Sequence, residues 1–488
     1  MKVLIIQPPH YFDGKFRSPG FFPVGLGHLT ASLHEENHEV EVFDIWAKHL
    51  SDEEVVRKIP SLDYDIVGIT ALSTQYKYVK WLAQQLKQHN DAPIVVGGPL
   101  GTFSAKEVLK HMQIDICVLS EGDIIFPNLI KNLGELEKVK GIVYCKNSEV
   151  IQNPPEKLIR DLDSLGFAVR DRKIFETDTY IKHGYLFGYP EIRTLNVMTN
   201  RGCPWQCNFC SKTFKSARLR SIPHVVEEIR MLKEEFGVGA IFFNDELLIM
   251  GIKRGYELCE ALKPLNIKWC GQARVDTVEL DLLKCMKDAG CVDIGLGIES
   301  GSQRILDAMN KRSTVEMNLS AIKAVKEAGL ETVAQCIYGY PGENSETVKE
   351  TIDFFRRADS LHQGFFVLTP LPGTTLYNRC VEQGVIVNED EYLSNLDAGY
   401  NTSRDALVNL TEFSIDEFYE TKDFMEDRIM RNYFLRHPFK QIVVRDDHNN
   451  LKYEFLGREV FRTAWKKISR RGLIQKNSRL TSYSGQSI

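Results

Sequence analysis

Three cysteines lie within eight residues of one another in the segment Arg201–Cys210, RGCPWQCNFC. Cys203, Cys207 and Cys210 have the spacing C-x-x-x-C-x-x-C, which lets one loop fold around a single metal centre. Thiolate ligands favour zinc or an iron–sulfur cluster. A closed structural zinc site needs a fourth ligand, and no Cys or His follows at the spacing of a zinc finger. Three ligands leave one iron of a four-iron cluster open to a small molecule, so we interpret the trio as cluster ligands.

The other eight of the eleven cysteines are single and fall mostly in apolar segments. Scattered thiols of this kind are typical of a reducing compartment, where Cys behaves as a small hydrophobic residue. The first residues, MKVLIIQPPH, are a poor signal peptide and a good first strand. We therefore expect a cytoplasmic protein. These single cysteines are Cys117, Cys145, Cys259, Cys270, Cys285, Cys291, Cys336 and Cys380.

The 488 residues are too many for one ordinary core, which predicts two or three domains. The composition, 43% hydrophobic and 26% charged, is that of a soluble globular protein, and no apolar run has the length of a membrane span. A net charge of -5 gives no overall attraction to nucleic acid. Only the end of the chain is basic, which we interpret as a solvated tail, with a membrane or nucleic-acid patch as the alternative. Its residues are Lys466, Lys467, Arg470, Arg471, Lys476 and Arg479.

Strands and helices alternate through the first third of the chain. Near-continuous Val/Ile runs separated by helical patterns predict a doubly wound, Rossmann-like parallel sheet covered on both faces. Ligands of such sheets bind beyond the carboxyl ends of the strands. The expected strands are Lys2–Gln7, His38–Ile45, Asp65–Leu72, Pro93–Gly98 and Asp115–Leu119, with helices at Gly25–Glu36 and Tyr76–Gln88. The expected ligand-binding rim is Pro8-Pro9, Ser73-Thr74, Gly97-Gly98-Pro99 and Glu121-Gly122-Asp123.

A second series of strands and helices predicts a partial (β/α)6 barrel of the TIM type, built by right-handed crossovers. Chemistry in such barrels sits at the carboxyl ends of the strands, where the cysteines, Asp245-Glu246, Arg274 and Glu299-Ser300 fall. The expected strands are Thr194–Thr199, Ala240–Asn244, Lys268–Gln272, Asp293–Ile298, Thr332–Tyr338 and Gly364–Leu368. The expected helices include Val225–Glu235, Leu280–Asp288, Met317–Ala328 and Ser345–Arg357.

The chain therefore divides into four expected regions. Residues 1–145 form the Rossmann-like domain, 146–190 a connector, 191–400 the partial barrel, and 401–488 a mainly helical segment, around Ile415–Phe434, that ends in the basic tail. The fold class is α/β.

The cysteine motif after the first barrel strand resembles that of the radical SAM superfamily. The resemblance implies that Cys203, Cys207 and Cys210 bind a [4Fe-4S] cluster whose fourth iron is chelated by S-adenosylmethionine (SAM). One electron then cleaves SAM to methionine and a 5′-deoxyadenosyl radical, so an external donor of the flavodoxin or ferredoxin type is expected. The resemblance assigns SAM contacts to Asp245, Glu246, Arg274, Glu299, Ser300, Tyr338 and Gly339.

Several of these SAM residues also have a plain structural explanation, and Asp245 and Glu246 could be ordinary strand-end carboxylates. Asp245 and Glu246 stand where the family has Gly-Gly-Glu, here Asn-Asp-Glu, so which carboxylate acts is open. Glu299 could form a structural ion pair, with Arg274 as its partner, and Gly339 could be a turn glycine. Their order, each at a strand end, favours a SAM site.

The N-terminal rim resembles the cobalamin-binding domain joined to many radical SAM enzymes. The residues that carry this resemblance are Pro9, Ser73, Thr74, Gly97, Gly98, Glu121 and Gly122, together with Pro23-Val24-Gly25-Leu26-Gly27. The fingerprint Asp-x-His-x-x-Gly, whose His ligates cobalt, is absent, and Leu100 follows Gly-Gly-Pro where many relatives have His. Several relatives hold cobalamin without a His ligand. A degenerate domain that binds nothing is the alternative.

Together these resemblances imply a cobalamin-dependent radical SAM enzyme that transfers a methyl group to an unactivated carbon. The alternatives are cyclisation or rearrangement without methyl transfer, and a redox or cobalamin-sensing protein. An RNA methylthiotransferase is disfavoured, because the N-terminal third has only Cys117 and Cys145 and lacks a second cysteine set. The substrate is expected to be a small or lipid-like molecule, and the sequence leaves its identity and the oligomeric state open.

Overall fold

The structure is a computed structural model of the 488-residue chain. It describes residues 1–12, 15–16, 20–183, 186, 189, 191–396, 407–437, 441–445, 451–455 and 481–482. The basic tail, from Lys466 to Arg479, lies outside the described residues. Within the described ranges, no helix has both the length and the apolar character that crossing a membrane requires.

The N-terminal domain is built on a seven-stranded sheet in the order β4-β1-β5-β6-β7-β8-β9. The first five strands are parallel, in the flavodoxin-like order 2-1-3-4-5, which confirms the doubly wound sheet. Their bounds are β1 (Lys2–Gln7), β4 (Glu39–Asp44), β5 (Ile66–Thr70), β6 (Ile94–Gly97) and β7 (Ile116–Val118). An antiparallel hairpin, β8 (Ile142–Lys146) and β9 (Glu149–Gln152), then extends the sheet past the expected boundary at residue 145.

Both faces of this sheet are covered because the strand side chains alternate between two cores. Val3 and Ile5 of β1 pack into the core shared with α1 and α6, whereas Leu4 and Ile6 pack into the core shared with α3 and α5. This burial on both faces explains why β1 reads as a continuous apolar run. The helices are α1 (Val24–Glu35), α2 (Asp52–Lys58), α3 (Tyr76–His89), α4 (Gly98–Phe103), α5 (Ala105–His111) and α6 (Gly122–Lys131).

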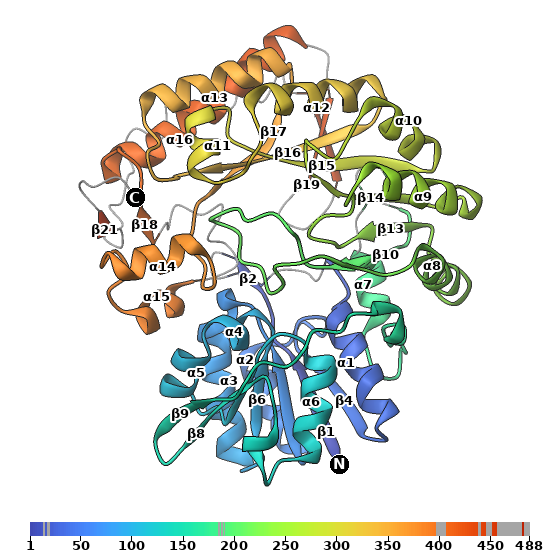
Figure 1. Ribbon diagram of the computed structural model, residues 1–488, viewed down its shortest axis with the longest axis vertical. Helices are drawn as coiled ribbons and strands as arrows, with labels where there is room; N and C mark the ends of the chain where they lie inside the picture. Colours follow the sequence, from blue (N-terminus) through green and yellow to red (C-terminus); the bar gives the residue numbers. More distant parts are fainter. Residues whose placement is uncertain are drawn as a thin grey trace.

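The second domain is a six-stranded parallel sheet in the order β10-β13-β14-β15-β16-β17, as expected for six successive βα units. Its helices lie on the outer face of the curved sheet (Figure 1). The strands are β10 (Thr194–Val197), β13 (Ala240–Phe243), β14 (Lys268–Ala273), β15 (Cys291–Glu299), β16 (Glu331–Tyr338) and β17 (His362–Val367). The helices are α8 (Ile222–Phe236), α9 (Ile252–Leu262), α10 (Leu280–Asp288), α11 (Gln303–Ala308), α12 (Val315–Glu327) and α13 (Ser345–Ala358).

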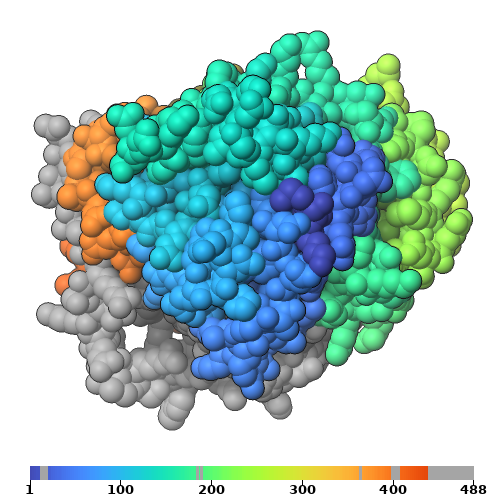
Figure 2. Space-filling model, turned by 90° about the horizontal axis from the view of Figure 1, so that it is seen from below, coloured from blue at the N-terminus to red at the C-terminus, as the bar shows by residue number. Residues whose placement is uncertain are grey.

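After the barrel the chain returns to the first domain. Helices α14 (Thr375–Glu382) and α15 (Glu389–Asn395) pack beside α3, where the Tyr76 hydroxyl donates to Asp390 at 2.6 Å and Lys80 pairs with the same carboxylate at 2.8 Å. In Figure 2 this orange segment lies against the light-blue part of the first domain. Helix α16 (Ile415–Arg436) then covers α13, which confirms the expected C-terminal helix. Short strands accompany it: β18 (Val408–Asn409), β19 (Gln441–Arg445), β20 (Leu451–Phe455) and β21 (Thr481–Ser482).

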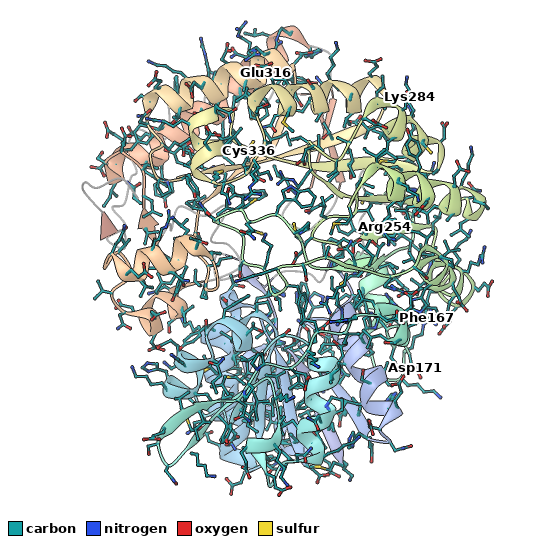
Figure 3. All side chains as sticks on the ribbon, viewed as in Figure 1. Phe167, Asp171, Arg254, Lys284, Glu316 and Cys336 are labelled. Carbon is teal, nitrogen blue, oxygen red and sulfur yellow. The ribbon has the colours of Figure 1, made fainter. Side chains whose placement is uncertain are left out.

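The connector between the two sheets is held by a buried ion cluster. Arg170 of the connector and Arg220 bind opposite oxygens of Glu228 on α8, at 2.7 and 2.6 Å. Phe167 and Asp171, which lie on either side of Arg170 in the sequence, are at one edge of the molecule where the two domains meet (Figure 3). Burial alone raises the pKa of Glu228, but Arg170 and Arg220 outweigh it, so the pKa lies below its ordinary value.

We predict that Glu228→Gln lowers the free energy of unfolding by about 3–5 kcal/mol, because it leaves two buried guanidinium groups without their carboxylate. Since the folded-state pKa is depressed, this stabilisation is complete at neutral pH and is lost as the pH falls through the folded-state pKa. Urea unfolding followed by circular dichroism measures the change. The neighbouring exposed residue provides the control, since Glu227→Gln should change stability by less than about 0.5 kcal/mol. Equal effects of the two substitutions would contradict the prediction.

Candidate functional site

A cavity of about 320 Å³ lies where the two domains meet. Residues just past the ends of β5, β6 and β7 line it from one side, and residues just past β10 and β13 line it from the other. The carboxyl ends of both parallel sheets therefore face one space, as ligand sites of such sheets do. Its apolar lining comes from Ile5, Leu26, Leu29, Val95, Val118, Phe126, Met198 and Phe214, and its polar lining from Thr70, Ser120, Glu121, Asp123, Asn200, Arg201, Asn244 and Glu246.

Glycines bring the backbone close to this cavity. Gly98 has φ +72°, and a Cβ there would meet the Ala71 carbonyl oxygen at 2.9 Å. Of the residues that the sequence assigned to cobalamin, Gly97, Gly98, Glu121 and Gly122 line the cavity.

The other three assigned residues, Pro9, Ser73 and Thr74, are not among the lining residues. They belong to a neighbouring turn, where the Gln75 side chain donates to the carbonyls of Pro8 and Pro9 at 3.0 Å. No histidine occurs among the described residues that line the cavity, and Leu100 is fully buried in α4.

The three clustered cysteines lie on the loop that leaves the first barrel strand. Cys203 and Cys207 are half-buried, and the Cys210 amide donates to the Cys207 carbonyl at 3.3 Å. Desolvation raises the pKa of the Cys210 thiol to about 12, an effect that Lys212 opposes and that Cys203 and Cys207 reinforce. The three sulfur atoms are therefore close enough to interact electrostatically. Thiols deprotonate when they bind a metal, so a metal centre would supply the missing positive charge.

The donor set fits an iron–sulfur cluster better than a single ion. In the described part of the chain, no three His, Cys, Asp or Glu side chains converge closely enough to share one metal ion. A lone zinc ion would require thiolates at about 2.3 Å from one point. In a cluster each cysteine binds its own iron, so the sulfur atoms stand farther apart.

The cysteine loop is anchored on both sides of the barrel mouth. The Asn208 amide donates to the Met309 carbonyl at 3.0 Å, after β15, and the Leu376 amide donates to the Asn208 carbonyl at 3.1 Å, after β17. The Ser211 hydroxyl donates to the Pro372 carbonyl at 2.9 Å. These bonds fix the loop across the strand ends, where the sequence placed the chemistry.

Arg274, at the end of β14, contacts the cysteine loop directly. Its guanidinium lies 4.7 Å from the centre of the Trp205 ring and 4.0 Å from the Cys207 sulfur, and it pairs with Asp276 at 2.9 Å. The expectation that Arg274 could pair with Glu299 is wrong. The partner of Glu299 is Lys311, which follows α11 and reaches back over the strand.

Asp245 and Glu246 are adjacent in sequence but have different surroundings. The buried Asp245 carboxylate accepts from the backbone amides of Thr199 and Asn200 at 2.7 and 2.9 Å, which holds the turn before the cysteine loop. Burial raises the pKa of Asp245 to about 7 despite these bonds. Glu246 lines the cavity, and desolvation also raises its pKa.

The remaining predicted SAM residues follow β15 and β16. Ser300 is buried and accepts from the Ser302 amide at 3.1 Å, and the Tyr338 hydroxyl donates to the Phe418 carbonyl of α16 at 2.6 Å. Gly339 has φ +100°, and its amide donates to Glu343 at 2.6 Å.

The resemblance placed Glu343 in the segment Ile337–Glu343, on the adenine side of the SAM site, without a role of its own, and burial raises the pKa of this carboxyl to about 7. The sequence shows a carboxylate in the segment Tyr340–Glu343, but it does not show that this carboxylate accepts a hydrogen bond from the Gly339 amide. Sequence reasoning missed Lys311.

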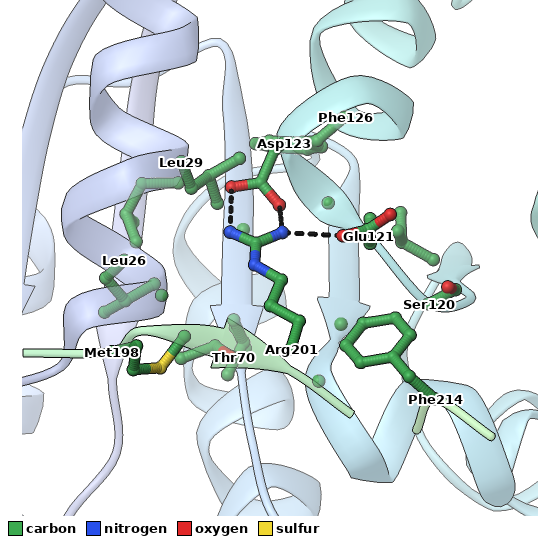
Figure 4. Close-up of a pocket in the computed structure, with 18 of the residues that line it drawn as sticks. Leu26, Leu29, Thr70, Ser120, Glu121, Asp123, Phe126, Met198, Arg201 and Phe214 are labelled. Atoms are coloured by element: carbon green, nitrogen blue, oxygen red, sulfur yellow. Dashed lines mark hydrogen bonds and ion pairs between the residues drawn. The ribbon is translucent and has the colours of Figure 1, made fainter. Parts of the chain in front are cut away.

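A set of buried ion pairs that the sequence did not predict joins the two domains beside the cavity (Figure 4). Its acidic members, Glu121 and Asp123, were expected only in the ligand-binding rim. Arg201, two residues before Cys203, pairs with Glu121 at 2.8 Å and with Asp123 at 2.7 Å. Arg218 binds the other oxygen of Glu121 at 2.7 Å. Burial opposes ionisation of Asp123, but Arg201 outweighs it and holds the pKa of that carboxyl below its ordinary value.

Two family models match the chain. The radical SAM superfamily matches residues 197–355, and the B12 binding domain matches residues 20–130. The chain is 33% identical over 399 residues to an uncharacterized methyltransferase of Pyrococcus horikoshii, covering 79% of this chain and 84% of that protein. It is 29% identical over 459 residues to the anaerobic magnesium-protoporphyrin IX monomethyl ester cyclase of Rubrivivax gelatinosus, covering 89% and 81%.

Among solved structures, the chain resembles the radical S-adenosylmethionine methyltransferase TsrM from Kitasatospora setae, which contains cobalamin and a [4Fe-4S] cluster. The TM-score is 0.66 at 19% sequence identity, and the match covers 78% of this chain and 75% of that one. At this identity the likeness establishes the shared fold.

His28 of α1 lies near the ion pairs of Arg201, and its buried imidazole should make the stability of the protein depend on pH. Burial, and then the charge of Arg201, lowers the pKa of His28 to about 4, and its Nδ1 lies 3.0 Å from the Gly166 carbonyl oxygen. The unfolded state takes up this proton near pH 6.5, whereas the folded state resists until about pH 4. We expect the free energy of unfolding to fall by roughly 2 kcal/mol from this group between pH 7 and 5.

Urea unfolding of His28→Gln across this pH range should show a correspondingly smaller fall. The matched control is His34→Gln, on the exposed side of the same helix, which should keep the wild-type slope. An unchanged slope in His28→Gln would show that His28 is not the group responsible.

Proposed function

The chain belongs to the radical SAM superfamily and carries a B12-binding domain, and we propose that it transfers a methyl group to an unactivated carbon with both cofactors. The observation that carries this proposal is a cavity onto which both sheets open, beside the loop that holds the three cysteines. The resemblance inferred from the cysteine motif is confirmed by the radical SAM match, and the one inferred from the N-terminal rim by the B12-binding match.

Cys203, Cys207 and Cys210 would hold the cluster. When bound, the cluster and SAM supply the 5′-deoxyadenosyl radical, and cobalamin supplies the methyl group. The protein binds and orients these groups and excludes water. Arg274 positions the cluster loop through Trp205 and Cys207, and Asp245 does so through the amides of Thr199 and Asn200.

We propose that Glu246, rather than Asp245, binds the amino group of SAM. Oδ1 of Asp245 already accepts two backbone hydrogen bonds and Oδ2 accepts one from the Thr199 hydroxyl, whereas Glu246 lies at the cavity surface. Glu299, Ser300, Tyr338 and Gly339 would complete the SAM site at the ends of β15 and β16.

The cavity would take part of cobalamin. Its volume of about 320 Å³ suits the aromatic base of that cofactor better than the whole molecule, and the apolar floor of Ile5, Val95 and Phe126 is chemically suited to an aromatic ring. No lining histidine is available among the described residues to ligate cobalt, so the proposal assigns no His ligand.

A second candidate function is ring formation without methyl transfer, because the Rubrivivax gelatinosus relative, matched over 89% of this chain, is a cyclase. In either case we propose an external electron donor of the flavodoxin or ferredoxin type and a small or lipid-like substrate. Mass spectrometry of extracts incubated with and without the protein separates the two reactions. Methyl transfer adds one methyl group to a metabolite, whereas a product that gains no methyl group would favour the cyclase.

We predict that Cys207→Ala abolishes formation of 5′-deoxyadenosine from SAM and lowers the iron content of anaerobically reconstituted protein, because one cluster ligand is lost. Cys145→Ala is the control, since Cys145 is an exposed cysteine on β8, in the other domain. It should keep both values within error of the wild type. Wild-type activity of Cys207→Ala, or zinc in place of iron, would contradict the proposed cluster.

We predict that Gly25→Leu weakens the binding of hydroxocobalamin at least tenfold while the iron content stays unchanged. Gly25 lines the cavity at the start of α1, and a Cβ there meets no atom within 4 Å, so the larger side chain fills open space without displacing the backbone. Absorbance titration measures the affinity. Gly134→Leu, at a glycine that is equally open and does not line the cavity, should bind as the wild type does.

A further inference from the structure

The cysteine loop is closed at its base by a two-stranded ribbon that places two arginines opposite each other. Strands β11 (Asn200–Arg201) and β12 (Arg218–Leu219) are antiparallel, and Arg201 and Arg218 are direct partners in the register. Like charges directly opposite each other across a ribbon repel. The base of the loop therefore needs an anion to hold the two strands together.

Glu121, from the N-terminal domain, is the anion that contacts both arginines, whereas Asp123 pairs with Arg201. One oxygen of Glu121 lies 2.8 Å from Arg201 and the other 2.7 Å from Arg218, and its side chain is only 3% exposed. Within the described residues Glu121 is the sole carboxylate paired with Arg218, whose Nε and Nη2 have no hydrogen-bond partner. The two strands that flank the cysteines are thus joined through a residue of the other domain.

Glu121 also belongs to the rim loop Ser120–Asp123, and all four residues of this loop line the cavity. Ser120 has φ +72°, a left-handed conformation that a non-glycine residue adopts only when its surroundings impose it. Its amide donates to the Thr102 hydroxyl at 3.1 Å. Gly202, the residue before the first cysteine, lines the same cavity from the barrel side. A ligand in the cavity therefore contacts both the rim loop Ser120–Asp123 and the start of the cysteine loop, which Glu121 connects.

We propose that Glu121 is a positioning residue that couples the cavity to the cysteine loop, so that cobalamin in the cavity and the cluster on the loop strengthen each other's binding. The inference rests on the proposed function, which places these two groups on either side of the Glu121 pair. Because coupling between two sites is reciprocal, it can be measured from either side.

The experiment titrates hydroxocobalamin into the full chain by absorbance, before and after anaerobic reconstitution of the cluster. We expect the wild type to bind hydroxocobalamin at least about fivefold more tightly with the cluster present. In Glu121→Gln this ratio should fall toward one. A merely structural role for Glu121 would weaken binding in both states equally and leave the ratio unchanged. The exposed Glu137, also in the N-terminal domain, provides the control, and Glu137→Gln should keep the wild-type ratio.

Equal wild-type affinities with and without the cluster, or an undiminished ratio in Glu121→Gln, would overturn the coupling. If Glu121→Gln does not fold, Arg218→Gln removes the other end of the same pair and should lower the ratio in the same way. Absence of any hydroxocobalamin binding by the wild type is a distinct result. It would refute the proposed cofactor, and the coupling with it.

Discussion

A buried charge is stable only when an opposite charge is brought to it, and this constraint organises the contact between the two domains. Glu121 and Asp123 of the first domain and Arg201 and Arg218 of the second form one compact, electrically balanced group. Removing one member of such a group leaves an uncompensated charge in a low-dielectric region. These ion pairs therefore fix the position of the two domains relative to each other, and the cysteine loop begins at this contact.

The second buried cluster applies the same rule on the connector side. Glu228 receives Arg170 from the connector and Arg220 from the segment that leads into α8, and all three side chains are almost fully buried. Two acidic centres, one on each domain, thus collect arginines from segments far apart in the sequence. Between them lies His28, whose pKa is lowered first by burial of the imidazole and then by the charge of Arg201, so it stays neutral at neutral pH.

Much of the fold could be predicted from the sequence because it depends on local patterns. Apolar runs located all six barrel strands, and the cysteine spacing marked the candidate cluster loop after the first of them. The β8–β9 hairpin was not predicted, because the strands were recognised by their alternation with helices and no helix lies between these two antiparallel strands. Contacts between segments far apart in the sequence could not be predicted either. Glu121 was assigned to a ligand, yet its carboxylate is directed to two arginines of the other domain, and Glu299 pairs with Lys311 rather than Arg274.

The return of α14 and α15 to the first domain has a consequence for synthesis on the ribosome. Lys80 on α3 pairs with Asp390, which is synthesised 310 residues later, so this surface of α3 has no partner until then. At a typical elongation rate of about 5–20 residues per second, that interval lasts roughly 15–60 seconds. Throughout it the nascent N-terminal domain presents an incompletely covered helix. The Lys80–Asp390 pair therefore forms only after the whole barrel has been synthesised.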